Sequence, residues 1–350
     1  MFVANFHKHT LNFKQASGTS RGILHTKNSW IISIFNIDDS SFVGKGEASI
    51  IENLSPDWSE NYEQKIAEVC ERINFYATHL NELNAFPSIQ FAIESALLDL
   101  KNGGAENYFL SDFNQGKKSI PINGLIWMGD KSFVQKQIQE KIEAGYSCIK
   151  LKIGTSASLG DQFSMSFDDE LSLIKSIRDK FSVHEIELRV DANGAFSTND
   201  ALKKLEQLAQ FDLHSIEQPI RAGQHEDMKK LCAQTPLPIA LDEELIGISD
   251  VKKKEELLHF IQPQYIILKP SLVGGFQKSD EWIAAAEKNK IGWWITSALE
   301  SNIGLSAIAQ YTFTKNVAMP QGLGTGQLFT NNFESGLRID KGRLWQGVSS

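Results

Sequence analysis

The stretch Glu187-Leu-Arg-Val-Asp-Ala-Asn-Gly194 (ELRVDANG) runs from alternating apolar residues into an acid and then into a turn signal. The alternation predicts a strand, and the sequence Asp-Ala-Asn-Gly predicts the turn that ends it. Taken alone, Asp191 is adequately explained as a turn residue, because Asp and Asn begin turns in many proteins. A chemical role for its carboxylate requires that the same pattern recur elsewhere in the chain.

The pattern does recur, because successive apolar strands end in charged residues. These residues are Lys152, Asp191, Glu217, Asp242 and Lys269, and the last four lie 26, 25 and 27 positions apart. The strands alternate with segments of helical period, near 167–181, 198–210, 226–233, 249–258, 278–289 and 302–313. About seven strand–helix units in succession favour an α/β fold whose parallel strands close into a barrel.

In such a barrel the carboxyl ends of the strands surround a single site, so these five charged residues become neighbours in space. Singly, each is equally consistent with a helix-capping acid or a surface lysine. Three acids in register between lysines favour a shared site instead. Oxygen donors without His or Cys suit a hard cation, with Mg²⁺ as the first expectation and Mn²⁺ as its substitute.

The lysines of this region suggest a chemistry. Lys150 and Lys152 are separated by one residue on a strand, so both face the barrel interior while Leu151 faces the helices. Two ammonium groups this close repel each other, and a nearby cation adds to the effect, so that one lysine can serve as a base. With Lys269 across the rim, the set favours proton abstraction next to a carboxylate. A non-catalytic ligand-binding barrel is the alternative from another class, and the intact set of charges counts against it.

The parts of the chain outside this run have a different rhythm. Residues 1–115 read as an α+β capping domain: strands at 2–13 and 29–37 with a small-residue loop between them, a helical segment at 58–83, and a helix from Pro87 to Gly103. Residues 116–318 form the predicted barrel, which contains the active site. Residues 319–350 return to turns and short strands and are expected to reach back to the cap.

Bulk properties exclude several classes of function. The formal net charge of -8 argues against nucleic acid and anionic membrane as partners, and no apolar run approaches the length of a membrane span. The N-terminus lacks the apolar region of a signal peptide. Cys70, Cys148 and Cys232 lie far apart and fit a reducing cytoplasm. We therefore expect a cytoplasmic protein with a small-molecule carboxylate substrate, and its oligomeric state stays open.

Five motifs together resemble the muconate-lactonizing branch of the enolase superfamily. They are IKLKIG (149–154), RVDANGAF (189–196), SIEQP (215–219), LDEEL (241–245) and ILKPSLVGG (267–275). The resemblance implies a (β/α)7β TIM-like barrel with an N-terminal α+β capping domain that the C-terminal tail completes. It also implies that Asp191, Glu217 and Asp242 bind Mg²⁺, with Lys152 as base and acid and Lys269 as a cationic stabiliser.

Within this branch the chain is most similar to dehydratases of menaquinone biosynthesis, which eliminate water in syn fashion from a cyclohexadiene carboxylate. The supporting segments are SGTSRG (17–22), PINGLIW (121–127), ITSALESNIGL (295–305) and GLGTGQLFT (322–330). Dipeptide epimerases of the branch carry an acidic D-x-D on the last barrel strand, which binds the substrate ammonium. Here that place reads Ser297–Ser301, which argues against an α-ammonium substrate. An N-succinylamino acid racemase or a cycloisomerase of the same branch is the alternative.

Further residues have weaker assignments. The expected substrate contacts are Lys150, which holds the substrate carboxylate or tunes Lys152, Asn193, Arg21 in the loop over the mouth, the hydroxyls of Ser297 and Ser301, and the backbone of Gly274. Asn193 is equally well explained as a plain turn residue. Glu243 is expected to pair with Lys269 or to face solvent, and Arg189 either neutralises part of the acidic cluster or is structural.

Overall fold

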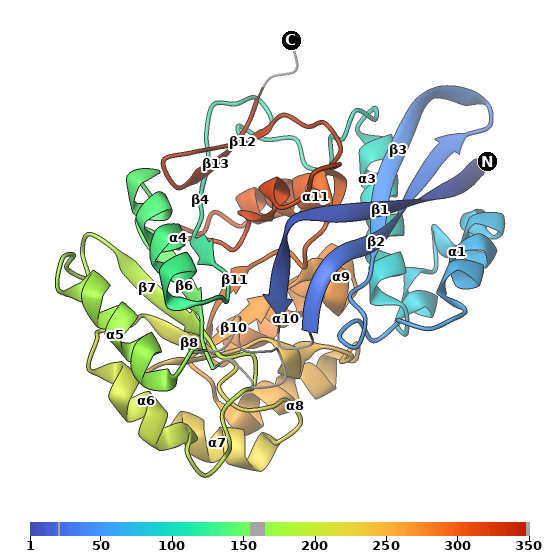
Figure 1. Ribbon diagram of the computed structural model, residues 1–350. Coiled ribbons are helices and arrows are strands. Elements are labelled where there is room, and N and C mark those ends of the chain that lie inside the picture. Colours follow the sequence, from blue (N-terminus) through green and yellow to red (C-terminus); the bar gives the residue numbers. More distant parts are fainter. Residues whose placement is uncertain (20–21, 155–164, 348–350) are drawn as a thin grey trace.

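The computed structural model describes residues 1–19, 22–154 and 165–347, which form a cap and a barrel (Figure 1). The cap contains an antiparallel sheet of β1 (Phe2–Thr19), β2 (Gly22–Asn36) and β3 (Asp39–Ser49). Its helices are α1 (Tyr62–Glu71), α2 (Ile73–Tyr76), the 3-10 helix η1 (Leu80–Leu83) and α3 (Pro87–Lys101). Pro87 occupies the first turn of α3, as predicted, where its missing N–H would have no helical partner.

The first two strands are longer than the sequence predicts. The expected loop between them is largely strand, because the ladder continues with Ser17 paired to Leu24 and Gly18 paired to Ile23. The ladder bonds join backbone groups, so small side chains do not end it. Its register shifts between Asn12 and Ser17, which is where the apolar alternation fades. Arg21, the expected mouth residue, lies outside the described residues.

The third strand packs closely against α3. Side chains at Gly44 and Gly46 would overlap the backbone of that helix at Ala96 and Ala92, so only glycine permits this approach. The face of the sheet that includes Trp30 and the two glycines packs on the cap helices and forms their apolar core. The opposite face points toward the barrel.

The barrel strands lie side by side in chain order. They are β5 (Gly124–Ile126), β6 (Cys148–Lys152), β7 (Glu187–Asp191), β8 (Ser215–Glu217), β9 (Ile239–Leu241), β10 (Tyr265–Leu268) and β11 (Gly292–Ile295), and all adjacent pairs are parallel. This confirms the predicted parallel arrangement. The large apolar core fills the interior of the barrel and the layer between its strands and the surrounding helices.

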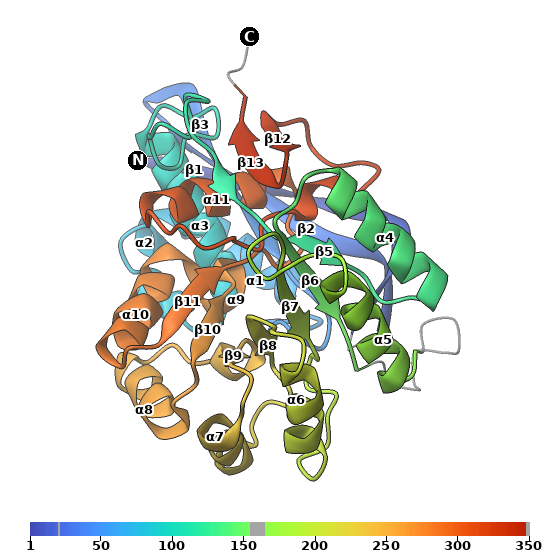
Figure 2. The ribbon, with the colours of Figure 1, turned by 90° about the vertical axis from the view of Figure 1, so that its left-hand side faces the viewer.

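A helix follows each strand and packs on the outside (Figure 2). These helices are α4 (Lys131–Glu143), α5 (Phe167–Arg178), α6 (Ala201–Ala209), α7 (His225–Gln234), α8 (Val251–Ile261), α10 (Gly275–Lys288) and α11 (Asn302–Thr314), with the short η4 (Glu243–Leu245) and α9 (Pro270–Val273) after β9 and β10. The sequence pattern predicts all of the long ones except α4. Only Val134 and Ile138 of α4 are buried, so its apolar stripe is too narrow to be recognised.

The two edges of this sheet are bridged by a short segment from the tail. Gln321 pairs with Ile122, just before β5, and Gly322 pairs with Thr296, just after β11. The backbone N–H of Gly322 donates to the carbonyl of Ile295 at 2.8 Å, and that of Asn123 donates to the carbonyl of Gln321 at 3.0 Å. Residues 321 and 322 therefore stand between the first and seventh strands.

The remaining tail contacts both bodies. After η5 (Thr325–Gln327), residues 328–330 hydrogen-bond with β1, where the N–H of Lys14 donates to Leu328 at 2.8 Å. The strands β12 (Leu337–Asp340) and β13 (Arg343–Gln346) then pair with each other, and β13 also pairs with β4 (Ile120–Pro121). The domain boundaries at residues 115 and 318 stay predictions. In the described ranges no helix combines the length and apolar character needed to cross a bilayer.

A buried acid attaches the segment between β3 and α1 to the start of α3. One carboxylate oxygen of Asp57 accepts hydrogen bonds from the N–H and the hydroxyl of Ser88, at 3.0 and 2.5 Å. Burial raises the pKa of Asp57 from 3.8 to about 6, against the lowering effect of these hydrogen bonds. Between pH 3.8 and about 6, the carboxyl group of Asp57 is therefore mostly protonated in the folded state and mostly ionised in the unfolded state.

We predict that Asp57→Asn changes how stability depends on pH. A raised carboxyl pKa stabilises the fold at low pH, and this contribution is lost as the pH rises from 3.8 through about 6. Relative to the Asn variant, which does not ionise, the wild type should lose on the order of 3 kcal/mol over this interval. Urea unfolding from acid to neutral pH measures the difference, and parallel curves for the two proteins would contradict the assignment.

Candidate active site

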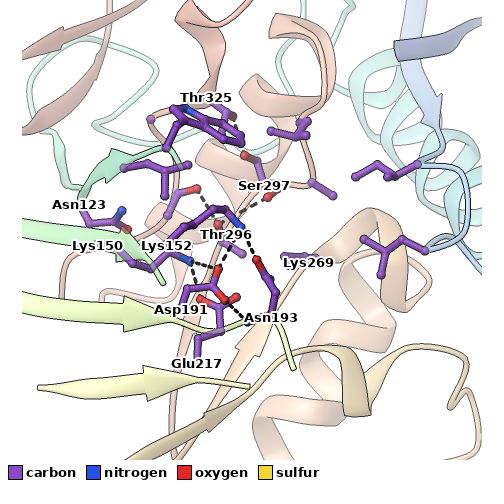
Figure 3. A pocket seen from close by; sticks show the side chains of 18 of the residues that line it. Asn123, Lys150, Lys152, Asp191, Asn193, Glu217, Lys269, Thr296, Ser297 and Thr325 are labelled. Atoms are coloured by element: carbon purple, nitrogen blue, oxygen red, sulfur yellow. Dashed lines mark hydrogen bonds and ion pairs between the residues drawn. The ribbon is translucent and has the colours of Figure 1, made fainter. Parts of the chain in front are cut away.

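A cavity opens at the carboxyl ends of the barrel strands (Figure 3). Charged side chains form its floor, hydroxyl and amide groups lie on one side, and apolar side chains complete the wall. Its lining includes Lys150, Lys152, Asp191, Asn193, Glu217, Glu243, Lys269, Asn123, Thr296, Ser297, Thr325, Leu125, Trp127, Leu299, Ile51 and Leu54. The last two come from the segment after β3, so the cap contributes to the cavity.

Strand register brings the charged residues together. Lys152 lies opposite Asp191 in the β6–β7 ladder, and Asp191 lies opposite Glu217 in the β7–β8 ladder. Glu217 lies opposite Ala240 of β9, and Asp242 is two residues further on, which returns its side chain to the same face. Asp242 is buried behind the cavity wall and contacts Lys269 from the end of β10.

Each of the three acids contacts a lysine. The Lys150 ammonium lies between Glu217, which it contacts directly, and Asp191, whose Oδ2 is 3.6 Å away. The Lys152 ammonium lies 3.2 Å from the same Oδ2 of Asp191. These groups are almost fully withdrawn from solvent, so each charge depends on its partners rather than on water.

The pKa values of the three acids do not all shift in the same direction. Burial, together with the charges of Asp191 and Asp242, raises the pKa of Glu217 to about 7, against the lowering effect of Lys150 and Lys269. Burial also raises the pKa of Asp242, against the effect of Lys269. The pKa of Asp191 is lowered, because the surrounding lysines outweigh the effect of burial.

The expected mutual repulsion of the lysines is not the dominant effect on Lys150. Burial lowers its pKa, but the charges of Glu217 and Asp191 outweigh burial and raise it. The pKa of Lys269 is raised for the same reason, by Asp242, Glu217 and Glu243 acting against burial. The prediction was wrong for Lys150 because carboxylates approach it more closely than another ammonium group does.

The donor chemistry of the three acids suits a hard cation, since all of their ligating atoms are oxygens. In the described ranges, however, no three His, Cys, Asp or Glu side chains are arranged to hold a metal ion. The reason is visible in Figure 3, where the carboxylates of Asp191 and Glu217 turn toward the lysine ammonium groups. The metal-ligand assignment of these acids stays a prediction.

Asn193 acts both as a turn residue and as a support for Lys152. Its N–H donates to Oδ1 of Asp191 at 3.0 Å, and its side-chain oxygen accepts a hydrogen bond from Lys152 at 2.7 Å. Its φ of 44° lies in the left-handed region that Asn tolerates better than most residues. Glu243 lines the cavity close to it, with 3.5 Å between the Asn193 amide nitrogen and a Glu243 oxygen.

Arg189 and Gly274, which were expected in the site, make contacts elsewhere. Arg189 does not neutralise Asp191; its Nε donates to Glu187 at 2.7 Å, and its guanidinium stacks over Trp294 at 4.5 Å from the ring centre. It lies one layer deeper in the barrel, which explains the difference. Gly274 has a φ of 103° and connects α9 to α10, where an added Cβ would meet Lys278, and it does not line the cavity.

The two serines that follow β11 lie in different surroundings. Ser297 lines the cavity, and its hydroxyl is 2.6 Å from that of Thr325. Ser301 is fully buried outside the cavity and donates to Glu47 of the cap at 2.5 Å. Its expected contact with substrate was wrong, because the residue caps α11 instead.

A short tail segment lies beside the loop that follows β11. Gly322 forms a bridge with Thr296, and Gly322 and Gly324 both line the cavity. The place that the sequence assigned to Ser297–Ser301 lies between β11 and the start of α11. Its comparison with the acidic pair of dipeptide epimerases stays a prediction.

Sequence reasoning missed a support behind the acids. Gln218 is buried, accepts a hydrogen bond from the N–H of Asp242 at 3.1 Å and donates to the carbonyl of Ile220 at 3.0 Å. It thereby fixes the end of β8 to the end of β9. Its φ of 38° is unusual for a residue with a side chain. Its place between Glu217 and Pro219 is the only signal in the sequence that pointed to it.

Comparison with known proteins identifies the family. A family model described as "Enolase C-terminal domain-like" matches residues 134–346. The chain therefore belongs to this family, within the enolase superfamily. It is 45% identical to the curated o-succinylbenzoate synthase of Desulfotalea psychrophila, an alignment that covers 99% of this chain and 98% of the relative.

Solved structures agree with this assignment. The crystal structure of MenC from Desulfotalea psychrophila has a TM-score of 0.85 and 42% identity, covering 98% of this chain and 99% of that one. A dipeptide epimerase from Enterococcus faecalis, solved with Mg and a dipeptide, has a TM-score of 0.80 at 19% identity, covering 99% and 97%. Together they confirm a TIM-like barrel with an N-terminal capping domain.

We predict that Lys150→Met destabilises the protein in metal-free buffer. Removing one partner of a buried ion pair leaves an uncompensated charge, which typically costs about 3–5 kcal/mol. Urea unfolding with a chelator present measures the loss. The matched control is Lys288→Met, whose 2.9 Å pair with Glu255 lies on the surface, and it should change stability by less than ~1 kcal/mol. Equal effects of the two variants would contradict this account of the cluster.

Proposed function

We propose that the protein is an o-succinylbenzoate synthase. In this reaction 2-succinyl-6-hydroxy-2,4-cyclohexadiene-1-carboxylate loses water and becomes the aromatic product of menaquinone biosynthesis. The proposal rests on the 45% identity to a curated o-succinylbenzoate synthase over nearly the full length of both chains. The cluster of lysines and acids beneath the cavity supports it. Aromatisation of the ring supplies part of the driving force. A cytoplasmic location agrees with three cysteines that form no disulfide.

We propose Mg²⁺ as the cofactor, with Mn²⁺ as a substitute, held by Asp191, Glu217 and Asp242. The support is the all-oxygen donor set, together with the strand register that places Asp191 opposite Glu217. A bound divalent cation would stabilise the negative charge that develops on the substrate carboxylate when the adjacent carbon loses its proton. Lys150 beside these acids would help to hold that carboxylate.

The chain's own residues would move the proton. Lys152, in its neutral form, would take the proton from the ring carbon that bears the carboxylate, and the electron pair would form the new ring double bond as the hydroxyl group leaves. Because the elimination is syn, the same Lys152 can return its proton to the departing hydroxide, which leaves as water. Asn193 holds the Lys152 nitrogen in place for both transfers. Lys269 would provide a fixed positive charge on the opposite face.

The other walls of the cavity suit the rest of the substrate. Leu125, Trp127 and Leu299 offer apolar surface for the ring. The paired hydroxyls of Ser297 and Thr325 would hydrogen-bond the succinyl carboxylate. Arg21 stays a prediction for this same group.

We also propose that the barrel closes in (β/α)7β fashion, with residues 321–322 as its final strand. The support is the pair of bridges from this segment to both edges of the seven-stranded sheet. This closure places Gly322 and Gly324 beside the first strand at the cavity wall. It makes the tail part of the site as well as part of the scaffold.

A racemase acting on N-succinylamino acids is the second candidate, because Lys152 and Lys269 approach the cavity from different strands and a racemase needs a base on each face. Incubation in D₂O separates the two. Stereorandom deuterium incorporation into an N-succinylamino acid, without dehydration of the cyclohexadiene substrate, would replace the first proposal with the second.

We predict that Lys152→Met lowers the rate of dehydration by about 10³-fold or more, because it removes the only group assigned to both proton transfers. An absorbance assay that follows aromatisation measures the rate, and circular dichroism checks the fold. The surface variant Lys288→Met should retain the wild-type rate. Wild-type turnover by Lys152→Met would exclude this residue as the base.

We predict that a chelator abolishes turnover and that added Mg²⁺ restores it in the wild type. In Asp191→Asn and Glu217→Gln the added metal should not restore it, because each change removes a charged ligand. Calorimetric titration with Mg²⁺ gives a readout independent of turnover and should detect weaker binding in both variants. Full activity of the wild type in excess chelator would contradict the metal assignment.

A further inference from the structure

The face of the cap sheet that points toward the barrel carries a strip of buried polar residues. Lys27 and Ser29 on β2 and Glu47 and Ser49 on β3 share this face, since Ser29 lies opposite Ser49 in the ladder and side chains alternate along a strand. Glu47 is fully buried. A buried carboxylate needs hydrogen-bond donors, and its donors reveal what the strip does.

Glu47 caps a barrel helix. Its Oε1 accepts hydrogen bonds from the Ser29 hydroxyl at 2.6 Å and the Ser301 N–H at 2.9 Å. Its Oε2 accepts from the Ser301 hydroxyl at 2.5 Å and the Gly304 N–H at 2.9 Å. Three of these four donors belong to the N-terminus of α11. A Cβ at Gly304 would lie 2.8 Å from Oε2, so glycine is required for this approach.

The loop just before α11, residues 297–300, forms part of the cavity wall; we call it the wall loop. Ser297, Ala298 and Leu299 all line the cavity. Leu299 has a φ of 64°, a conformation that costs a residue with a side chain on the order of 1 kcal/mol or more. Such a conformation persists only where the surrounding structure holds it.

Two anchors hold the wall loop. Within the barrel, Glu300 accepts hydrogen bonds from the N–H of Ala298 at 2.7 Å and from the hydroxyl of Ser271 at 2.5 Å. Ser271 lies two residues after Lys269, so this anchor also joins the loop to the helix that follows the opposed lysine. The second anchor is the cap, through Glu47 and the residue that follows Glu300.

Lys27 places an amine near both anchors. Burial lowers its pKa, and the charges of Glu47 and Glu300 offset only part of that lowering. Its ammonium donates to the hydroxyl of Ser49, on the same strand as Glu47. The cap thus supplies both a carboxylate that binds the helix and a buried amine close to two acids.

We infer that Glu47 is a positioning residue for substrate binding: from the cap, it fixes the wall loop and so sets the place of Ser297 and Leu299 in the cavity. The choice of substrate for the test of this inference rests on the proposed function. Glu47 does not line the cavity, so its effect is exerted through Ser301 and Gly304.

Glu94 provides a matched control. It is a half-buried acid of the cap, on α3, and it also caps a barrel helix, accepting hydrogen bonds from the N–H groups of Phe276 and Gln277 at 2.6 and 3.1 Å. The start of α10 does not line the cavity. A purely structural attachment of cap to barrel would make the two acids equivalent.

The experiment compares Glu47→Gln with Glu94→Gln. An amide keeps one acceptor and places N–H donors against the donors of the helix, so both variants should lower Tm. Only Glu47→Gln should raise KM for the cyclohexadiene substrate, by about tenfold, with a smaller change in kcat. Hydrogen exchange should quicken at Ala298 and Ser301 in Glu47→Gln, and only at residues 276–277 in Glu94→Gln.

Equal KM values in the two variants, or unchanged exchange in the wall loop of Glu47→Gln, would overturn the inference. If Glu47→Gln does not fold, Ser301→Ala keeps the charge, removes one donor and should produce the same two changes to a smaller extent. A wild-type protein without dehydratase activity would refute the proposed function alone, because hydrogen exchange still decides whether Glu47 holds the wall loop.

Discussion

The structure depends on the balance between buried lysines and buried acids at the carboxyl ends of five neighbouring strands. Lys150 and Lys152 come from β6 itself, while Asp191, Asp242 and Lys269 stand at or just past the ends of theirs, so strand register alone brings them within contact distance. Removing charged groups from water is costly, and only mutual pairing makes the arrangement stable. The same pairing keeps these groups fixed in a cavity that a substrate can enter, so stability and chemistry depend on the same contacts.

The barrel and its charged floor were predictable because both rest on spacing. Alternating strands and helices gave the parallel order, and acids that recur once per strand–helix unit gave their proximity. Three features were not predictable: the extent of β1 and β2, the helix α4, and the position of the segment that bridges to both edges of the sheet. Ladder bonds ignore side-chain size, α4 buries too few apolar residues, and residues 321–322 are too short to form a recognisable strand.

Within the site, the pattern located the charged residues but not their individual partners. It did not reveal that Ser301 binds Glu47, that Arg189 binds Glu187, or that Gln218 connects two strand ends. These contacts depend on side-chain direction in three dimensions and join residues from different layers. Glu47 illustrates the difficulty, because the short alternation of glycine and charge in GKGEAS (44–49) has no meaning until the strand lies between α3 and α11.

The segment Gln321–Gly322 has a consequence for how the protein is made. It forms bridges to both edges of the parallel sheet, yet it follows all seven strands in the sequence. During synthesis, the seven strands leave the ribosome well before the residues that join their edges. The nascent barrel therefore passes through an interval with two unpaired strand edges, when intermolecular association is most favourable and chaperones are most useful.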